Sequence, residues 1–413
     1  MRVVFVNFRS SASSALLRTS EALSEVGVTV HSFTFRSLVK EDFPLKISLF
    51  NKWLFSLNFL IDLFITRFIY SKSDMFFSRN LNLWSSFLSN QYNGIFIKFD
   101  LVHLHWVGHG FISTDFLMKL KLNKLVITFH DYYFITGGCH VPIECDKYIK
   151  ECRNCPAGRI FYDFQLKNFN EKKILFQSVK IFAIAPSEVM ALKIRNSELG
   201  KFIYEVIVVP NPIDVNLYKP IDLCIDERIL DRKLTKDKKV VLMVANDLSD
   251  RNKGLDLLVT ALSIIKDNRN FCLVTVGDKM PSFNVKLGFD IIHLGSLNDA
   301  TDLIEIYNRA YMTVVPSRFE SFSQVTLESL SCGTPVVSFD SSGPSEIIKN
   351  NINGLLAHSF SEVDLSNKIE SLLVNPILHS FYSENARKMV AEKYSFRAVG
   401  ELHKSEYNRI INC

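Results

Sequence analysis

Two glutamates in the last quarter of the chain have a spacing that suits one long polar ligand. Glu320 and Glu328 lie on either side of the start of an expected helix. At a rise of 1.5 Å per residue, their carboxylates would lie ~12 Å apart and could hold opposite ends of such a ligand. The alternative is that both are solvated charges on an ordinary surface helix, so the surrounding residues must decide.

The residues around the two glutamates predict a strand that leads into this helix. The apolar run 310–316 is typical of a buried strand. Ser321 or Ser323 can cap the helix, and Gly333 can end it. Because a helix N-terminus offers backbone N–H groups and a partial positive charge, this junction suits a phosphate or a diphosphate.

Residues 316–356 resemble the signature region of the family 4 glycosyltransferases, which are retaining enzymes of the GT-B fold that use nucleotide-sugars. The shared elements are two glutamates separated by seven residues, a Gly-Thr-Pro-Val-Val strand, a Gly-Pro turn and an Asn-Gly pair. The resemblance implies that Glu320 contacts the hydroxyls of the donor sugar and that Glu328 holds the ribose. It places three backbone N–H groups near the donor, those of Ser321, Phe322 and Ser323.

The diphosphate of such a donor needs positive charge, because the leaving group becomes more anionic as the glycosidic bond breaks. The resemblance implies that basic residues supply it and that no metal or other cofactor takes part in catalysis. The Lys253-Gly254 pair after the expected strand 240–245 matches the phosphate clamp of the family. Many relatives have an arginine six residues before this lysine, where this chain has Asp247. Arg251 is the candidate replacement.

Two histidines end expected strands in the first half of the chain. His105 closes the strand 100–105, and His130 closes the strand 125–130. Ligand crevices of parallel sheets lie beyond the carboxyl ends of the strands, so both side chains are expected there. The Thr-Phe-His-Asp sequence resembles the family position at which a histidine touches the donor sugar. This implies a catalytic His130 and a supporting His105, although each could instead be a neutral structural histidine. The first loop, 7–14, has serines where the family has a pair of glycines.

Length and composition indicate a globular protein of two domains. The chain has 413 residues, of which 47% are hydrophobic and 22% are charged, enough to form two buried cores. The net charge of +5 is small for this length and no block of basic residues is present, so nucleic acid is not an expected partner. The first residues show no leader-like apolar segment, which predicts a cytoplasmic protein.

The alternation of strands and helices predicts two doubly wound, Rossmann-like α/β domains that face each other across a cleft, which is the GT-B fold. The expected strands are 2–7, 28–35, 100–105, 125–130 and 181–186 in the first half, and 240–245, 271–277, 291–294, 312–316 and 335–339 in the second. We expect an acceptor-side domain at 1–207 and a nucleotide-sugar domain at 208–395, joined by the proline-rich connector 208–214. The amphipathic segment 396–413 is expected to cross back to the first domain.

Half of the eight cysteines are close together in the sequence: Cys139, Cys145, Cys152 and Cys155. Four thiolates with a Cys-x2-Cys half are the ligand set of a structural zinc site, although the other half has a wider spacing than usual. The segment resembles a cysteine-bearing subgroup of bacterial glycosyltransferases for capsule, O-antigen and exopolysaccharide synthesis. The alternative is four reduced cysteines that pack a loop. A disulfide framework is not expected in a reducing cytoplasm.

Residues 45–70 form a Phe-rich, strongly apolar stretch. Asp62 and Arg67 interrupt it, so we do not expect it to cross a membrane. It could be a core-facing helix. It could equally be an interfacial helix on the inner leaflet, with Lys46 and Lys52 near anionic lipid.

These observations predict a cytoplasmic or peripherally membrane-associated retaining glycosyltransferase. Its expected partners are a nucleotide-sugar donor and a growing glycan acceptor on a polyprenyl carrier. Three alternatives stay open: a zinc-stabilised interaction protein on a degenerate transferase fold, a nucleotide-sugar epimerase and a phosphorylase. The last would need a lysine for pyridoxal phosphate in a recognisable setting, which we do not find in the sequence.

Overall fold

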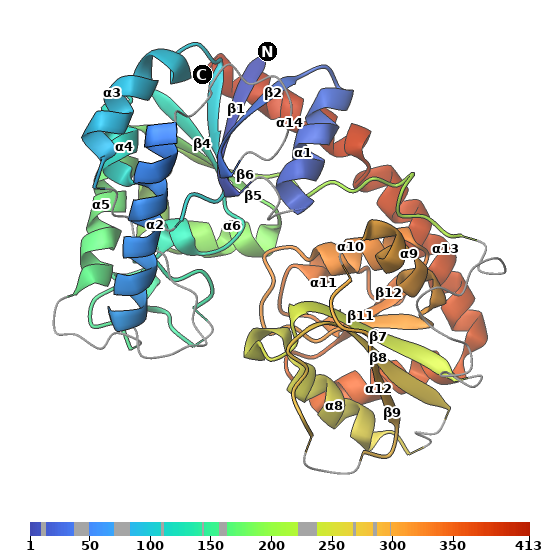
Figure 1. Cartoon of the computed structure of the whole chain (residues 1–413). Coiled ribbons are helices and arrows are strands. Elements are labelled where there is room, and N and C mark those ends of the chain that lie inside the picture. The colour runs from blue at the N-terminus through green and yellow to red at the C-terminus, as the bar shows by residue number, and fades with distance from the viewer. Residues whose placement is uncertain are drawn as a thin grey trace. The chain divides into compact units, whose positions relative to one another are not determined.

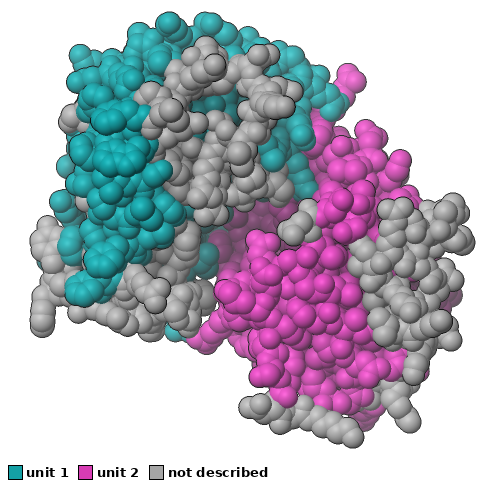
Figure 2. Space-filling model, viewed as in Figure 1, with its two compact units in different colours: residues 1–212, 399–413 teal, residues 213–398 magenta. Residues whose placement is uncertain are grey.

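The chain forms two compact units, each built on its own parallel sheet. The computed structural model describes residues 1–9, 14–36, 49–69, 83–108, 111–142, 144–156, 163–221, 238–266, 270–283, 287–297 and 299–413. Unit 1 comprises residues 1–212 and 399–413, and unit 2 comprises residues 213–398 (Figure 2). The unit boundaries thus fall at 212/213 and 398/399, against the predicted 207/208 and 395/396.

Unit 1 contains a six-stranded sheet with the strand order β2-β1-β3-β4-β5-β6 (Figure 1). Its strands are β1 (Arg2–Arg9), β2 (Thr29–Arg36), β3 (Leu101–Leu104), β4 (Lys124–Thr128), β5 (Lys180–Ala185) and β6 (Glu205–Val208). Its α-helices are α1 (Ser14–Glu25), α2 (Leu49–Ile69), α3 (Ser85–Phe96), α4 (Thr114–Lys119), α5 (Phe164–Ser178) and α6 (Glu188–Arg195). Its 3₁₀ turns are η1 (Tyr133–Ile135), η2 (Lys147–Ile149) and η3 (Leu199–Phe202).

Unit 1 is stabilised by apolar strands and by polar residues at the helix starts. The side chains of β1, β3, β4 and β5 are nearly all buried, as expected for parallel strands covered on both faces. Ser113, Asp163 and Ser187 accept backbone N–H groups at the first turns of α4, α5 and α6. The last helix, α14 (Phe396–Ile411), packs on this unit through the fully buried Tyr407.

Unit 2 repeats the architecture with the strand order β12-β11-β10-β7-β8-β9 (Figure 1). Its strands are β7 (Lys239–Asp247), β8 (Phe271–Asp278), β9 (Asp290–His293), β10 (Met312–Val315), β11 (Val336–Phe339) and β12 (Gly354–Ala357). Its helices are α8 (Leu255–Ile264), α9 (Ala300–Arg309), α10 (Gln324–Ser331), α11 (Pro344–Ile347), α12 (Glu362–Val374) and α13 (Pro376–Lys393), with the 3₁₀ turn η4 (Arg251–Lys253). Because β7 precedes both β8 and β10 in the chain, the strand order reverses between β7 and β10, where ligands of such sheets bind.

All ten predicted strands are confirmed, with ends shifted by one or two residues. Two strands, β6 and β12, were not predicted. Both have four residues and lie at a sheet edge, so neither carries a long apolar pattern. The helix expected after Glu320 is present as α10, with Ser323 as its cap and Gly333 beyond its end at a φ of 79°.

The Phe-rich stretch forms the helix α2, which has both buried and exposed apolar side chains. Leu54 and Phe55 are buried, whereas Trp53, Phe64 and Phe68 are exposed. Lys46 lies outside the described residues. Among the residues that the structure describes, no helix is both long enough and apolar enough to span a bilayer.

The turn between η4 and α8 depends on a glycine. Gly254 has a φ of 74°, and a Cβ there would lie 2.1 Å from the carbonyl oxygen of Pro316. Gly295 in the same unit has a φ of 71° but nothing within 4 Å of its Cβ position. The two glycines share the left-handed conformation, and only Gly254 also needs the close approach.

We therefore expect Gly254→Ala to lower the free energy of unfolding of unit 2 by about 1–3 kcal/mol more than Gly295→Ala, because only the first substitution adds a clash to the backbone strain. Urea denaturation of both variants measures the difference. Equal losses would show that the turn can move away from Pro316.

Candidate functional site

Lys253 and Glu320, which are 67 positions apart in the chain, form an ion pair in unit 2. Lys253 Nζ lies 2.8 Å from Glu320 Oε1, and each side chain is about a quarter exposed (28% and 21%). Lys253 ends the turn that follows β7, and Glu320 lies in the loop that follows β10. Because β7 and β10 are parallel neighbours, their carboxyl ends bring these loops together. Glu320 raises the pKa of Lys253, so the amine is a cation at neutral pH.

Hydrogen bonds fix the two loops to each other around this pair. Asn252 donates to the carbonyl of Phe319 at 2.9 Å and accepts from its backbone N–H at 3.1 Å. Arg318 binds both carboxylate oxygens of Asp256, at 3.0 and 2.7 Å. A bidentate pair of this kind holds its partners in one orientation. The loop positions around Lys253 and Glu320 are therefore well defined.

The first turn of α10 adjoins Glu320. Ser323 accepts a hydrogen bond from the backbone N–H of Thr326 at 3.2 Å and has a φ of 100°, which is unusual for a residue other than glycine. The ring of Phe322 is buried in the core of the unit. A Cβ on Gly343 would lie 2.5 Å from the backbone of Phe322, so the Gly-Pro turn packs closely against this segment. Non-glycine residues with a positive φ are often found at functional sites.

Two other residues, Glu328 and Arg251, were predicted to bind the nucleotide-sugar donor. Glu328 is buried, and its Oε2 accepts a hydrogen bond from the hydroxyl of Tyr307 at 2.9 Å. Arg251 is exposed at the start of η4. Asp247, at the place of the expected arginine, forms an ion pair with Lys279, a basic residue at the end of β8 that we had not singled out.

In unit 1 the two predicted histidines contact each other. His105 Nδ1 lies 3.0 Å from His130 Nε2, and the rings are stacked with centroids 5.3 Å apart. His103 packs against His105 and bonds to Tyr407 and Thr128, at 2.7 Å each. Burial lowers the pKa of His130 to about 4, so its imidazole is neutral at pH 7.

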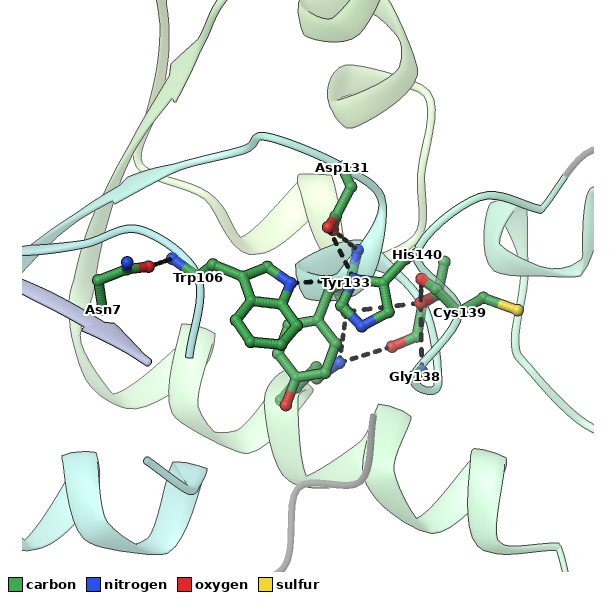
Figure 3. Close-up of polar contacts among 9 residues, drawn as sticks. Asn7, Trp106, Asp131, Tyr133, Gly138, Cys139 and His140 are labelled. Carbon is green, nitrogen blue, oxygen red and sulfur yellow. Dashed lines mark hydrogen bonds and ion pairs between the residues drawn. The ribbon is translucent and has the colours of Figure 1, made fainter. Parts of the chain in front are cut away.

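A second polar group, which the sequence did not predict, adjoins this pair (Figure 3). His140 Nδ1 donates to Asp131 Oδ2 at 2.7 Å, and the indole Nε1 of Trp106 lies 3.3 Å from the same nitrogen. The backbone N–H of Trp106 donates to Asn7 Oδ1 at 3.0 Å, which joins the ends of β1 and β3. Burial alone would raise the pKa of Asp131, but His140 lowers it overall. Asp131 is thus an oriented carboxylate next to His130.

The base of this group is a buried lysine. Lys172 of α5 is 1% exposed, and its Nζ lies 3.7 Å from the centre of the Tyr133 ring. It donates to the carbonyl oxygens of Tyr133 and Thr136. Tyr133 in turn stacks on the ring of His140, with an interplanar angle of 13°. The only signal for this network in the sequence was the proximity of Asp131 to His130 and of His140 to the cysteines.

The four clustered cysteines line one pocket between η1 and α5. These four and the other described cysteines form no disulfide with one another. Burial, together with the neighbouring cysteines, raises the pKa of Cys139 well above its usual value. No group of three or more His, Cys, Asp or Glu side chains within the described ranges is arranged to hold a metal ion.

The predicted site residues thus form two groups, one in each unit. Unit 2 brings together Lys253, Glu320 and the start of α10. Unit 1 brings together His105 and His130, with the cysteine pocket beyond Asp131 and His140.

The buried histidines predict a loss of stability in acid. Burial lowers the pKa of His130 to about 4 and that of His403 to about 3, below the ordinary value of 6.5. Between pH 6.5 and the lowered pKa values, these histidines bind protons in the unfolded chain but not in the native chain. The free energy of unfolding is therefore fully retained above pH 6.5 and falls as the pH drops towards 4. His403→Asn should flatten this pH dependence in urea denaturation. His358→Asn, at a side chain 85% exposed, should leave it unchanged. A free energy of unfolding that stays constant over this range would contradict the analysis.

Comparison with known proteins gives this geometry a context. Residues 226–389 match the family model described as glycosyl transferases group 1. An uncharacterized glycosyltransferase of Methanocaldococcus jannaschii is 26% identical over 322 residues, which cover 74% of each chain. The N,N'-diacetylbacillosaminyl-diphospho-undecaprenol alpha-1,3-N-acetylgalactosaminyltransferase of Campylobacter jejuni is 29% identical over 50% of this chain and 55% of its own length.

A solved structure shows the same fold over the whole chain. It is that of HepE from Anabaena in complex with UDP, with a TM-score of 0.63 and 16% identity over 99% of this chain and all of that one. Residues 226–389 are thus similar to the group 1 glycosyl transferases, and the two parallel-sheet units of the chain have the GT-B fold.

Proposed function

We propose that the chain is a retaining glycosyltransferase that moves a sugar from a nucleotide-diphosphate donor to a growing, lipid-linked surface glycan. The observation that carries the proposal is the Lys253–Glu320 pair at the carboxyl edge of the sheet in unit 2. The name of the Campylobacter relative, which includes diphospho-undecaprenol, supports the acceptor class. The UDP bound by HepE supports the donor class.

Lys253 and α10 would hold the diphosphate. The amine is a cation, and the N-terminus of α10 adds a partial positive charge next to it. A bound diphosphate that pairs with Lys253 in place of Glu320 would leave the carboxylate of Glu320 to accept hydrogen bonds from the sugar hydroxyls. This carboxylate already accepts a hydrogen bond from the hydroxyl of Ser317 at 3.0 Å. The attraction of both positive groups for the leaving group becomes stronger as the leaving group gains negative charge. In this way they would lower the barrier without a metal ion.

His130 would orient the sugar as a neutral imidazole. Its low pKa keeps it uncharged, so it can make one hydrogen bond as a donor and one as an acceptor. His105 already occupies Nε2 at 3.0 Å, which leaves Nδ1 for a substrate hydroxyl. Asp131, held by His140, would supply a fixed negative charge beside the positive charge that develops on the sugar ring.

The helix α2 supports a peripheral position on the inner face of the cytoplasmic membrane. Its polar residues Asn51, Asn58 and Asp62 are at most 2% exposed, and Asn51 donates to Tyr92 at 2.8 Å. Several of its apolar residues point outward; those at least 50% exposed are Phe50, Trp53, Leu60, Phe64 and Phe68. An exposed apolar face of this kind is typical of an interaction surface, and a lipid-linked acceptor would be presented at a lipid surface.

Removing either member of the ion pair should abolish most of the activity. We expect Lys253→Ala and Glu320→Ala each to lower kcat by a factor of about 100 or more, because each removes one preorganised electrostatic group. The assay measures transfer of labelled sugar to a lipid-linked acceptor in the presence of EDTA, and NMR of the product gives its anomeric configuration.

Lys238→Ala is the matched control for this test. Lys238 pairs with Asp290 at 2.7 Å, but it lies beside the amino end of β7, at the opposite edge of the same sheet. Its loss should leave kcat unchanged. Normal turnover of both site variants, a requirement for magnesium, or epimerisation of the free nucleotide-sugar would each overturn the proposal.

The exposed face of α2 should bind lipid. Flotation with vesicles should show binding that rises with anionic lipid and falls with salt, since about 1 kcal/mol comes from each basic residue near the surface. The double variant Phe64→Ser/Phe68→Ser should lower vesicle binding while leaving nucleotide binding intact.

The matched control changes two exposed apolar residues of unit 2. Val374 and Ile377 are 73% and 82% exposed, and Val374→Ser/Ile377→Ser should bind vesicles like the unchanged chain. If the unchanged chain does not float with anionic vesicles at low salt, α2 is not a membrane surface.

A further inference from the structure

The pocket lined by the four cysteines has the chemical lining of a metal-thiolate site. Cys139, Cys145, Cys152 and Cys155 share it with Thr136, Gly137, Pro142, Lys147, Tyr148, Pro156 and Gln165. The lining contains no carboxylate and no imidazole. Its strongest potential metal ligands are therefore sulfur atoms, and a set of four thiolates is typical of zinc or of an iron–sulfur cluster.

Two hydrogen-bond donors belong to residues that line this pocket. The backbone N–H of Gly137 donates to Cys152 Sγ at 3.2 Å. The side chain of Gln165 is 4% exposed, and its Nε2 has no hydrogen-bond partner among the residues that the structure describes. A buried donor without a partner costs free energy, so its persistence indicates an acceptor at this place. A thiolate accepts N–H bonds well, and such bonds commonly surround metal-bound sulfur.

A buried lysine lies near the same sulfurs, and burial lowers the pKa of this Lys172 to about 7. Lys172 forms no ion pair within the described residues, and it donates only to backbone carbonyls. Cys152 and Cys139 are among the groups that act on its charge. A buried cation requires compensation. An anionic sulfur centre would supply it.

The turn between Cys152 and Cys155 is also held in place from outside. Lys147 donates to the carbonyl oxygens of Arg153 and Asn154, at 3.0 and 2.5 Å. The backbone N–H of Asn154 donates to Asp163 at 2.7 Å, and Asp163 also caps α5. The Cys-x2-Cys half is thus set against the start of α5, the helix that carries Gln165 and Lys172.

We propose that Cys139, Cys145, Cys152 and Cys155 bind one zinc ion as four thiolates. Each thiol loses its proton on binding, so one Zn²⁺ and four thiols give a centre with a net charge of −2 and release four protons. Gly137, Gln165 and Lys172 provide the hydrogen bonds and the positive charge that such a centre needs. Because no three of the ligands are already arranged around a metal, binding draws the four sulfurs inward.

The zinc centre would position the group at Asp131. Cys139 directly precedes His140, and its carbonyl accepts from Thr136 at 2.7 Å. Fixing Cys139 therefore fixes His140 against Asp131, beside His130. This positioning role rests on the proposed function, whereas zinc binding does not.

Metal analysis of the full chain tests the site. Elemental analysis of the purified protein should give about one zinc per chain. Cys152→Ser/Cys155→Ser should reduce it to near zero, and Cys413→Ser, at an exposed cysteine outside the pocket, should retain it. Cobalt added to zinc-depleted unchanged protein should give the intense absorption of a tetrahedral cobalt–thiolate centre, a readout that does not depend on the folding of any variant.

The outcomes separate the parts of the proposal. A protein that contains no zinc and gives no cobalt–thiolate spectrum would overturn the site, and iron in its place would overturn the assignment to zinc. Zinc removal should lower the melting temperature of unit 1 and lower kcat at least several-fold, with donor binding to unit 2 unchanged. Unaltered kcat after complete zinc removal would overturn the positioning role.

Discussion

The parallel direction of both sheets is the constraint from which the two candidate sites follow. In a parallel sheet every strand delivers the chain to the same edge, and the next helix begins there. In unit 2 this brings the loops after β7 and β10 together, which allows Lys253 to meet Glu320 next to the start of α10. In unit 1 it brings the ends of β1 and β3 together at the Asn7–Trp106 hydrogen bond.

The two sheet edges differ in the charge and in the exposure of their side chains. The unit 2 edge keeps a partly exposed cation and carboxylate in contact, so a charged ligand can compete for either. The unit 1 edge buries neutral imidazoles such as that of His130, and its Asp131–His140 contact is largely enclosed. Burial favours the neutral form of a histidine, which suits hydrogen bonding to a sugar. In the proposed function, the unit 2 edge would hold the diphosphate and the unit 1 edge would orient the sugar.

The strands and the loop residues after them could be predicted from the sequence, because apolar runs and capping residues act locally. Ser323 caps α10 as expected, and Lys253 and Glu320 both follow strands whose order the fold determines. The Asp131–His140–Trp106 contacts could not be predicted. They arise in an irregular loop, where no periodicity sets the direction of a side chain. Lys172 was missed because a lysine in a helix is normally exposed, and only the tertiary structure shows that it is buried. The inverted exposure of α2 was missed for the same reason: polar residues such as Asn51, Asn58 and Asp62 are normally exposed, and only the tertiary structure shows that they are buried.

We propose that the carboxyl edge of the sheet in unit 2 binds a nucleotide diphosphate. A crystal structure of the chain with a nucleoside diphosphate, chosen as the one that most raises its melting temperature, tests it most directly. We expect diphosphate oxygens within hydrogen-bond distance of Lys253 Nζ and at the first turn of α10, with Glu320 released from the lysine. A diphosphate bound at any other place, with the Lys253–Glu320 pair intact, would contradict it.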